Sequence, residues 1–164
     1  MEMFMKLLIA ALALLGTLSA TAQTLKWSYT ANNAWDYTTD GRGNLAVISS
    51  HASGVGLGII TWVDASGRQL FTNYIADVGQ NIASSIVRFV RFNRSELTVQ
   101  VQASYEHAPG TNFLRRYRRN GSFTDTVLPV GENMDELPSK LLDNHGYFTR
   151  ESTPGALIFR RYSN

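Results

Sequence analysis

Short runs rich in β-branched, aromatic and aliphatic residues follow one another from about residue 25 to the end of the chain. Gly, Asn, Asp, Ser and Pro separate these runs, and no apolar pattern of helical period extends over a helix-length stretch after the N-terminal segment. The pattern therefore predicts an all-β domain, with only weak helical signals at 81–85 and 134–142. The expected strands span 25–29, 34–39, 45–50, 57–63, 69–75, 86–92, 96–103, 112–118, 122–128, 146–150 and 156–162.

Tight turns separate several of these strands. The segments 40–44, 65–67 and 93–95 are rich in Asp, Asn, Ser and Gly, which tolerate turn conformations. Asn120-Gly121 is the strongest signal, because both residues adopt positive φ and the pair favours a two-residue hairpin. The strands on either side of each turn are therefore expected to pair antiparallel.

Similar segments recur along the chain at a spacing of about 50 residues, the period of a repeated supersecondary unit. In each unit, a turn leads into an aliphatic strand, and a later strand runs into a tight hairpin. The aligned segments are 43–47, 95–99 and 145–148, followed by 60–67, 115–121 and 159–164. The chain thus divides into repeat units at about 24–75, 83–128 and 139–164, each expected to hold four strands.

This strand order, with an Asp-Gly turn before an aliphatic strand and an aromatic residue before a hairpin, resembles the bacterial secreted β-propeller repeat proteins. That broad group includes the quinoprotein-like and WD-type repeats. The resemblance covers about residues 24–164 and includes no complete WD, kelch or quinone-binding fingerprint, so it implies a fold and no particular activity. It implies about three four-stranded antiparallel blade-like units; a β-sandwich is the alternative.

The last unit is incomplete, because it stops at Asn164, where the second unit has its hairpin turn at Asn120. Propellers often combine strands from both termini in one blade, so the resemblance implies that 25–29 is the missing outer strand. Three units are fewer than the four to eight blades that are typical. Three explanations stay open: a homodimeric ring with exchanged edge strands, a fragment of a longer propeller, or a sandwich in which the repeat is coincidental.

The N-terminal segment has the pattern of a signal peptide. Lys6 precedes the apolar run 7–15, and Ala20-Thr21-Ala22 forms an A-x-A cleavage site. The run is shorter than the roughly 20 apolar residues of a membrane span. We therefore expect residues 1–22 to be removed and 23–164 to form one secreted or periplasmic domain without a membrane span. The chain has no cysteine, so this domain is expected to fold without disulfides.

Candidate metal and cofactor motifs are weak. The histidines His51, His107 and His145 lie far apart and lack a metal-ligating spacing. The glycine-rich segment 54–58 leads into a strand, so it does not offer phosphate a helix N-terminus. The segment 40–44 supplies too few oxygen ligands for calcium. No metal or cofactor is expected.

Acid–base chemistry would need a pair of carboxylates. Asp135 with Glu136, or Asp36 with Asp40, are the pairs that the sequence offers. Such pairs arise easily by chance, so the sequence favours a non-catalytic protein and assigns no catalytic residue. A secreted hydrolase-like enzyme is the alternative.

An arginine-rich strand at 112–119 carries the candidate binding chemistry, and 160–162 repeats it. Strand alternation places Arg115 and Tyr117 on one face and Arg116 and Arg118 on the other. Guanidinium groups bind phosphate, sulfate or carboxylate, and interleaved aromatic rings stack on sugars or bases. A solvated strand edge is the alternative interpretation. The candidate binding residues are Arg115, Arg116, Tyr117, Arg118, Arg119, Arg160 and Arg161.

Together these patterns predict an exported binding or protein-interaction module of β-propeller type. Its expected partners are an anionic polysaccharide or other polyanion, and a second copy that exchanges an edge strand. A truncated propeller fragment without independent function is the remaining alternative.

Overall fold

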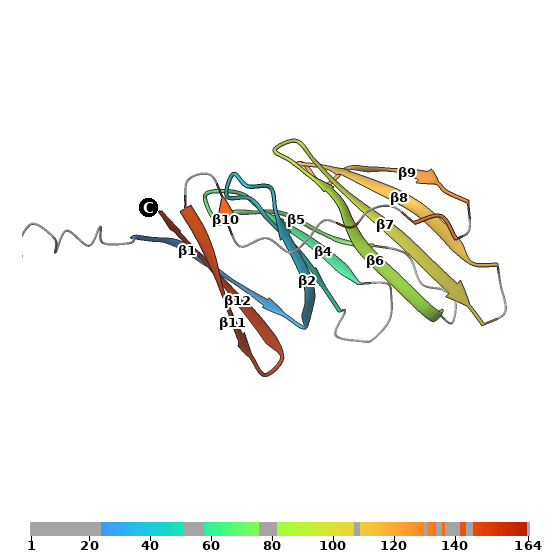
Figure 1. Cartoon of the computed structure of the whole chain (residues 1–164), viewed down its shortest axis with the longest axis horizontal. Coiled ribbons are helices and arrows are strands. Elements are labelled where there is room, and N and C mark those ends of the chain that lie inside the picture. The colour runs from blue at the N-terminus through green and yellow to red at the C-terminus, as the bar shows by residue number, and fades with distance from the viewer. Residues whose placement is uncertain are drawn as a thin grey trace, which may run out of the picture.

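The computed structural model describes residues 24–50, 58–75, 82–106, 109–129, 131–133, 136, 142–143 and 146–163 (Figure 1). Within these ranges the protein is all β, with strands β1 to β12 in three four-stranded antiparallel sheets. The described residues include no helix that is long and apolar enough to cross a membrane. The predicted signal peptide lies outside the described residues.

Each sheet follows the chain as an antiparallel meander, apart from one strand. Sheet I has the order β10-β11-β12-β1, sheet II the order β2-β3-β4-β5 and sheet III the order β6-β7-β8-β9. The strands of sheet I are β10 (Leu142–Asp143), β11 (Gly146–Thr153), β12 (Ala156–Ser163) and β1 (Thr24–Asn32). Those of sheet II are β2 (Ala34–Thr39), β3 (Leu45–Ser49), β4 (Ile59–Val63) and β5 (Gln69–Tyr74). Those of sheet III are β6 (Ile82–Phe92), β7 (Glu96–Tyr105), β8 (Thr111–Arg118) and β9 (Phe123–Val127).

The N-terminal strand completes the last sheet, as the resemblance to β-propellers implies. β1 pairs with β12 in antiparallel register, so that Tyr29 lies opposite Phe159 and Asn32 opposite Ala156. This pairing is made within one chain. Asn33, with φ of 52°, is the single residue between β1 and β2, and its amide donates to the Gly155 carbonyl at 2.7 Å. One residue thus carries the chain from sheet I to sheet II.

Two elements differ from the sequence prediction. The weak helical signal at 81–85 is wrong over 82–85, which open the long strand β6. Alternating pairing with β7 overrides the local preference there. The second helical signal, 134–142, lies outside the described residues except for Glu136, which belongs to no helix or strand, and Leu142, which begins β10, a short strand that was not predicted.

Sheet II lies between sheets I and III, and each of its faces is covered. Ile48, Ile60 and Trp62 on one face pack in a cluster with residues such as Phe89 and Val99 of sheet III. Residues of the opposite face form a second cluster with sheet I; they include Leu45, Val47 and Val63, packed with Phe148 and Phe159. Because strand residues alternate between faces, sheet II reads as a near-continuous apolar run in β3 and β4.

Candidate functional site

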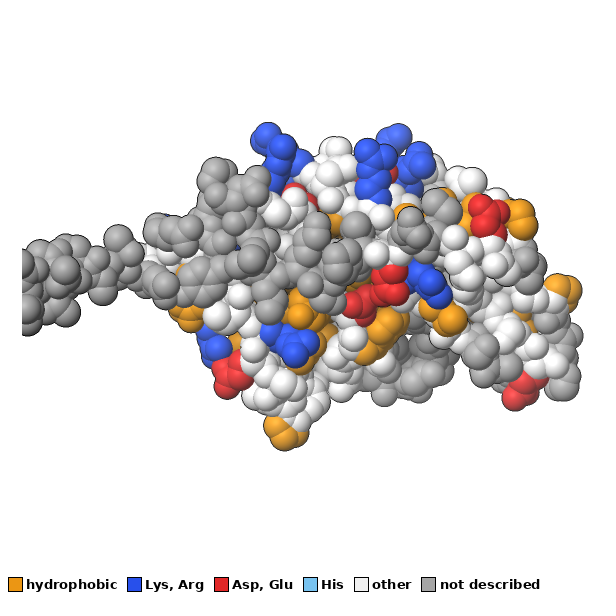
Figure 2. Space-filling model, in the orientation of Figure 1, with side chains coloured by type: hydrophobic (Ala, Val, Ile, Leu, Met, Phe, Trp, Pro, Cys, Tyr) orange, Lys and Arg blue, Asp and Glu red, His pale blue; other side chains and the backbone are white. Residues whose placement is uncertain are grey.

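Basic side chains gather along one edge of the molecule. Figure 2 shows Lys and Arg side chains along the upper edge of the view, the edge at which the β6–β7 turn lies in Figure 1. Four hairpin turns of sheets II and III meet in the pocket at this edge: β2–β3, β4–β5, β6–β7 and β8–β9.

Three of these turns share one local rule, an Asp or Asn followed two residues later by Ser. The Asp64 carboxylate accepts from the Ser66 amide at 2.9 Å and from its hydroxyl at 2.5 Å. The Asn93 and Asn120 side chains accept in the same way from the Ser two residues onward, at 2.8–3.0 Å. A side-chain oxygen that accepts hydrogen bonds from the amides of the turn takes the place of backbone acceptors, and this fixes the conformation of the turn. The sequence therefore makes these turns rigid supports.

The β2–β3 turn is tied to the β4–β5 turn through Asn44. Asp40 accepts from the Arg42 amide at 2.8 Å and from the Asn44 side-chain amide at 2.6 Å. The Oδ1 atom of the Asn44 side chain in turn accepts from the Ala65 amide at 3.2 Å. Asn44 is buried, with 4% of its surface exposed, so this bridge holds the two turns of sheet II at a fixed separation.

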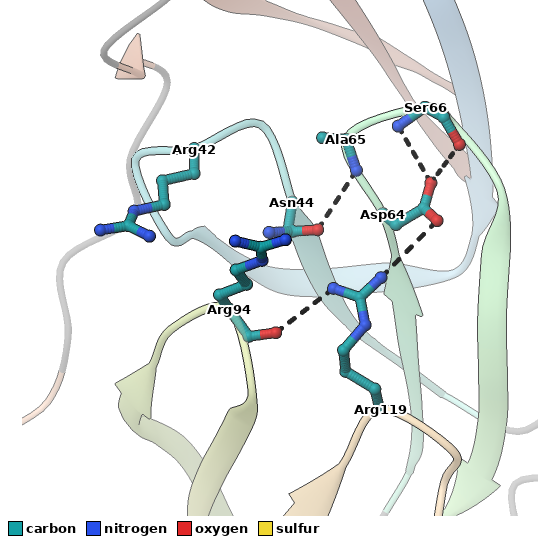
Figure 3. Close-up of a pocket in the computed structure, with 7 residues that line it drawn as sticks. All are labelled: Arg42, Asn44, Asp64, Ala65, Ser66, Arg94 and Arg119. Atoms are coloured by element: carbon teal, nitrogen blue, oxygen red, sulfur yellow. Dashed lines mark hydrogen bonds and ion pairs between the residues drawn. The ribbon is translucent and has the colours of Figure 1, made fainter.

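An open pocket of about 610 Å³ lies between the turns of sheet II and those of sheet III (Figure 3). Sheet II supplies Arg42, Asn44 and the β4–β5 turn, and sheet III supplies Arg94 and Arg119. Among the described residues, three guanidinium groups and one carboxylate therefore line it. The lining residues are Arg42, Asn44, Asp64, Ala65, Ser66, Arg94 and Arg119.

Arg119 is held in the pocket by neighbours from both sheets. One of its terminal nitrogens donates to the Arg94 carbonyl at 3.2 Å, and the other lies 3.7 Å from the Asp64 carboxylate. Its guanidinium carbon also lies 5.8 Å from the centre of the Trp62 ring, within cation–π range. These contacts orient Arg119 before any ligand arrives.

Asp64 is already occupied by internal partners. Burial alone would raise its pKa, but hydrogen bonds from the Ser66 hydroxyl and from the Arg68 and Ser66 amides, with the charge of Arg68, lower it. The carboxylate is therefore ionised at neutral pH and serves the turn. In contrast, the guanidinium groups of Arg42 and Arg94 make no ion pair with another described residue. Among the described residues that line the pocket, the positive charge thus exceeds what Asp64 balances.

The predicted binding residues are not brought together. Tyr117 is fully buried and stacks on Phe71, with ring centres 5.4 Å apart. Arg115 is held by Asp125 at 2.7 and 2.8 Å, donates to the Ile75 carbonyl and lies over the Phe123 ring at 4.0 Å. The predicted alternation of β8 is confirmed, and it turns this face toward sheet II. Arg115 and Tyr117 therefore hold the two sheets together.

The other predicted residues are spread over three places. Arg116 lies on the opposite face of sheet III, 3.4 Å from Glu96, and Arg118 is exposed beside the β8–β9 turn. Arg160 pairs with Glu151 at 2.6 Å on sheet I. Arg161 covers Gly43 so closely that a Cβ there would lie 2.6 Å from its Nε. Arg119 alone lines the pocket.

The sequence prediction does not include Arg42 and Arg94, because each is a single arginine within a turn and lies outside the arginine-rich strand. Each occupies a position inside a turn whose first residue is Asp40 or Asn93. A search for arginines within such Asp- or Asn-led turns, combined with the repeat, would have placed them at one edge.

Candidate catalytic and metal-binding groups do not form a second site in the described part of the chain. The Asp36 carboxylate accepts from the Tyr37 amide at 2.7 Å, and Asp40 supports its own turn. The three histidines, Asp135 and most of the 54–58 segment lie outside the described residues. Among those that are described, no three His, Asp or Glu side chains are grouped to hold a metal ion.

No family model, curated protein or solved structure matches this chain. A function therefore has to be inferred from the pocket lined by Arg42, Arg94 and Arg119, here called the arginine pocket.

Proposed function

We propose that this protein is a non-catalytic binding module that takes the anionic groups of a polymer, such as sulfate, phosphate or carboxylate, in the arginine pocket. The observation that carries the proposal is the convergence of Arg42, Arg94 and Arg119 from two sheets on one open pocket. Asp64, the one carboxylate among the described lining residues, already accepts three hydrogen bonds. An anionic ligand would supply the missing negative charge.

The chemistry of the side chains favours this ligand class. A guanidinium is a planar fork that donates two parallel hydrogen bonds to a carboxylate, sulfate or phosphate, and such charged hydrogen bonds are stronger than neutral ones. The rigid turns limit the ordering that a ligand would have to impose on the backbone. Asn44 and Ser66 add neutral polar groups at the pocket wall.

A polymer fits better than an isolated ion because positive charge continues beyond the pocket. The Arg68 side chain at the β4–β5 turn is 73% exposed, and Arg118 is exposed where β8 ends. A ligand with several anionic groups would contact the pocket and these flanking arginines at once, which multiplies weak contacts into useful affinity.

We also propose a setting for this activity. Four-stranded meanders, with the fourth strand of sheet I supplied by the N-terminus, support blade-like units of the β-propeller type. The predicted signal peptide at 1–22 supports export, where anionic polysaccharides would be encountered. Mass spectrometry of the exported protein would test whether residues 1–22 have been removed.

The test compares binding to dextran sulfate with binding to unmodified dextran, which has the same backbone and lacks the charge. We expect binding to the sulfated polymer only, weakening as salt rises. Arg42→Ser and Arg94→Ser should each weaken it about tenfold, the effect of losing one charged hydrogen bond of about 1.5 kcal/mol.

Arg116→Ser is the matched control. It removes the same charge from a side chain that is 54% exposed and lies outside the pocket. It should leave the affinity within about twofold of the unmodified protein, because a screened charge at a distance contributes little. Equal weakening by all three substitutions would mean that the polymer senses only net charge, and the assigned pocket would be wrong.

A further inference from the structure

Strand β9, at the edge of sheet III, is exposed along its whole length. It pairs with β8 on one side only and is the last strand of its sheet (Figure 1). Each of its residues from Phe123 to Val127 is exposed, and the two apolar side chains at its ends are 46% and 84% exposed. A strand of this kind at a sheet edge is a template for pairing with another strand.

Three residues of β9 turn their backbone polar groups away from sheet III. The Leu128 amide, just after β9, donates to the Asn112 carbonyl of β8 at 2.8 Å, so this pair of the ladder is hydrogen-bonded. Hydrogen-bonded and non-hydrogen-bonded pairs alternate along an antiparallel ladder. Phe123, Asp125 and Val127 therefore form the non-hydrogen-bonded pairs with β8. Their amides and carbonyls face outward, where none of the described residues pairs with them.

The corresponding fourth strands of the other two sheets have protection that β9 lacks. In β1 the register with β12 shifts between Leu25 and Trp27, and Lys26 is exposed there. The register between β4 and β5 is also interrupted. Irregular register and lysine at an edge discourage pairing with another chain. The β8–β9 register is unbroken, and Asp125 is the one charged residue of β9, so this edge is open to an added strand.

We propose that β9 binds an extended peptide segment of a partner protein, which joins sheet III as an antiparallel fifth strand. The backbone of such a segment presents donors and acceptors at the spacing of alternate strand residues. It would therefore donate to and accept from Phe123, Asp125 and Val127, whose polar groups face outward. Main-chain hydrogen bonds of this kind supply the affinity when a peptide adds to a sheet edge.

The side chains of β9 specify the sequence of the partner segment. Phe123 and Val127 favour aromatic or β-branched residues directly opposite them. The side chain of Asp125 lies between them and is 36% exposed, although Arg115 donates to both of its oxygens. A carboxylate has lone pairs for further donors, so a lysine opposite Asp125 suits this position. The partner segment therefore has apolar residues two positions before and two positions after a lysine.

A second copy of β9 fits this edge less well. Antiparallel pairing that brings Phe123 of each copy opposite Val127 of the other also places the two Asp125 carboxylates opposite each other. Like charges in directly opposed positions destabilise a strand pair. The peptide site is also separate from the proposed anion site, because no residue of β9 lines the arginine pocket.

The test titrates the protein with a blocked peptide centred on Val-Thr-Lys-Thr-Val. We expect saturable shifts and slower hydrogen exchange for the amides of Phe123, Asp125 and Val127 in nuclear magnetic resonance spectra. Replacing the peptide's lysine by glutamate should weaken binding about tenfold, the effect of losing one charged hydrogen bond. N-methylation of its lysine and both valines should abolish binding, because it removes the donors that face β9. An absence of saturable shifts in these amides would overturn the proposal.

A proline substitution tests the edge from the side of the protein. The Val127 amide faces outward, so Val127→Pro removes no hydrogen bond to β8, and proline is tolerated on an edge strand. It should weaken peptide binding about tenfold, whereas Val127→Thr, which keeps the amide, should stay within about threefold. Circular dichroism and unchanged binding to dextran sulfate would show that both variants are folded. Equal peptide binding by folded Val127→Pro would overturn the proposal, as would dimerisation of the peptide-free protein that Val127→Pro abolishes.

Discussion

Gly67 is the residue whose substitution tests most sharply how the N-terminal strand joins the fold. It lies in the β4–β5 turn with φ of +87°, and a Cβ placed on it would lie 2.7 Å from Cγ and 2.8 Å from Cβ of Trp27 in β1. Optimal carbon–carbon contacts are about 3.5–4.0 Å, so the ring would have to move. Trp27 is anchored, because its indole nitrogen donates to the Ala65 carbonyl at 3.0 Å.

Gly67→Ala should therefore destabilise the protein for two reasons. The left-handed backbone conformation costs about 1–2 kcal/mol for a residue with a Cβ. Displacing the Trp27 ring adds about 1–3 kcal/mol, the usual cost of overpacking. The expected loss in the free energy of unfolding is about 2–5 kcal/mol, measured by urea denaturation followed by circular dichroism.

Gly41→Ala is the matched control, since Gly41 has φ of +73° and a Cβ there would meet nothing within 4 Å. It should cost only the backbone strain of about 1–2 kcal/mol. In a Trp27→Gly background, which removes both the ring and the Cβ of residue 27, the cost of Gly67→Ala should fall to that of Gly41→Ala, because the clash is gone. Equal losses for the two glycine variants in the unmodified background would refute the packing of β1 on this turn.

Three further predictions concern buried polar groups. Because the folded pKa of Asp64 lies below its ordinary value, its ionised form adds stability that is complete above about pH 4 and is lost as the pH falls further. This acid-dependent loss, measured from the midpoints of urea denaturation, should be smaller in Asp64→Asn, and a pH profile equal to that of the unmodified protein would contradict it. Burial raises the pKa of Tyr117 to about 12, and its hydroxyl has no hydrogen-bond partner among the described residues. Tyr117→Phe should therefore change the free energy of unfolding by less than about 1 kcal/mol, and a larger loss would contradict the absence of a hydrogen bond to this hydroxyl. Asn112→Ala should lower the free energy of unfolding by about 2 kcal/mol and speed amide hydrogen exchange around 131–133, because the Asn112 side chain donates to the Pro129 and Glu132 carbonyls. Unchanged exchange there would show that Asn112 does not hold this segment.

Much of the architecture follows from patterns that are visible in the sequence. Short runs of β-branched, aromatic and aliphatic residues, separated by turn residues, predict eleven of the described strands in order, because such residues suit paired strands. The resemblance to β-propellers implies that the N-terminal strand completes the last unit, and the pairing of β1 with β12 confirms that this strand joins the last sheet. The short strand β10 escaped because two residues, Leu142 and Asp143, carry no periodic signal.

The site was harder to predict for a physical reason. Arg115 and Tyr117 belong to an arginine-rich strand, but strand alternation turns them toward sheet II, where they bind protein groups. The sequence does not state which sheet faces which, so an intersheet arginine and a ligand-binding arginine look alike. Arg42 and Arg94 lie more than fifty residues apart and meet only because equivalent turns of two stacked sheets end at the same edge.

The most direct test of the central claim is to observe the arginine side chains themselves while ligand is added. Nuclear magnetic resonance spectra of the guanidinium Nε–H groups would be recorded during titration with sulfated dextran oligomers. The account predicts saturable shifts for Arg42, Arg94 and Arg119, together with the backbone amides of the β4–β5 turn, and little change for Arg116. Shifts confined to Arg116, or an absence of saturable shifts, would contradict it.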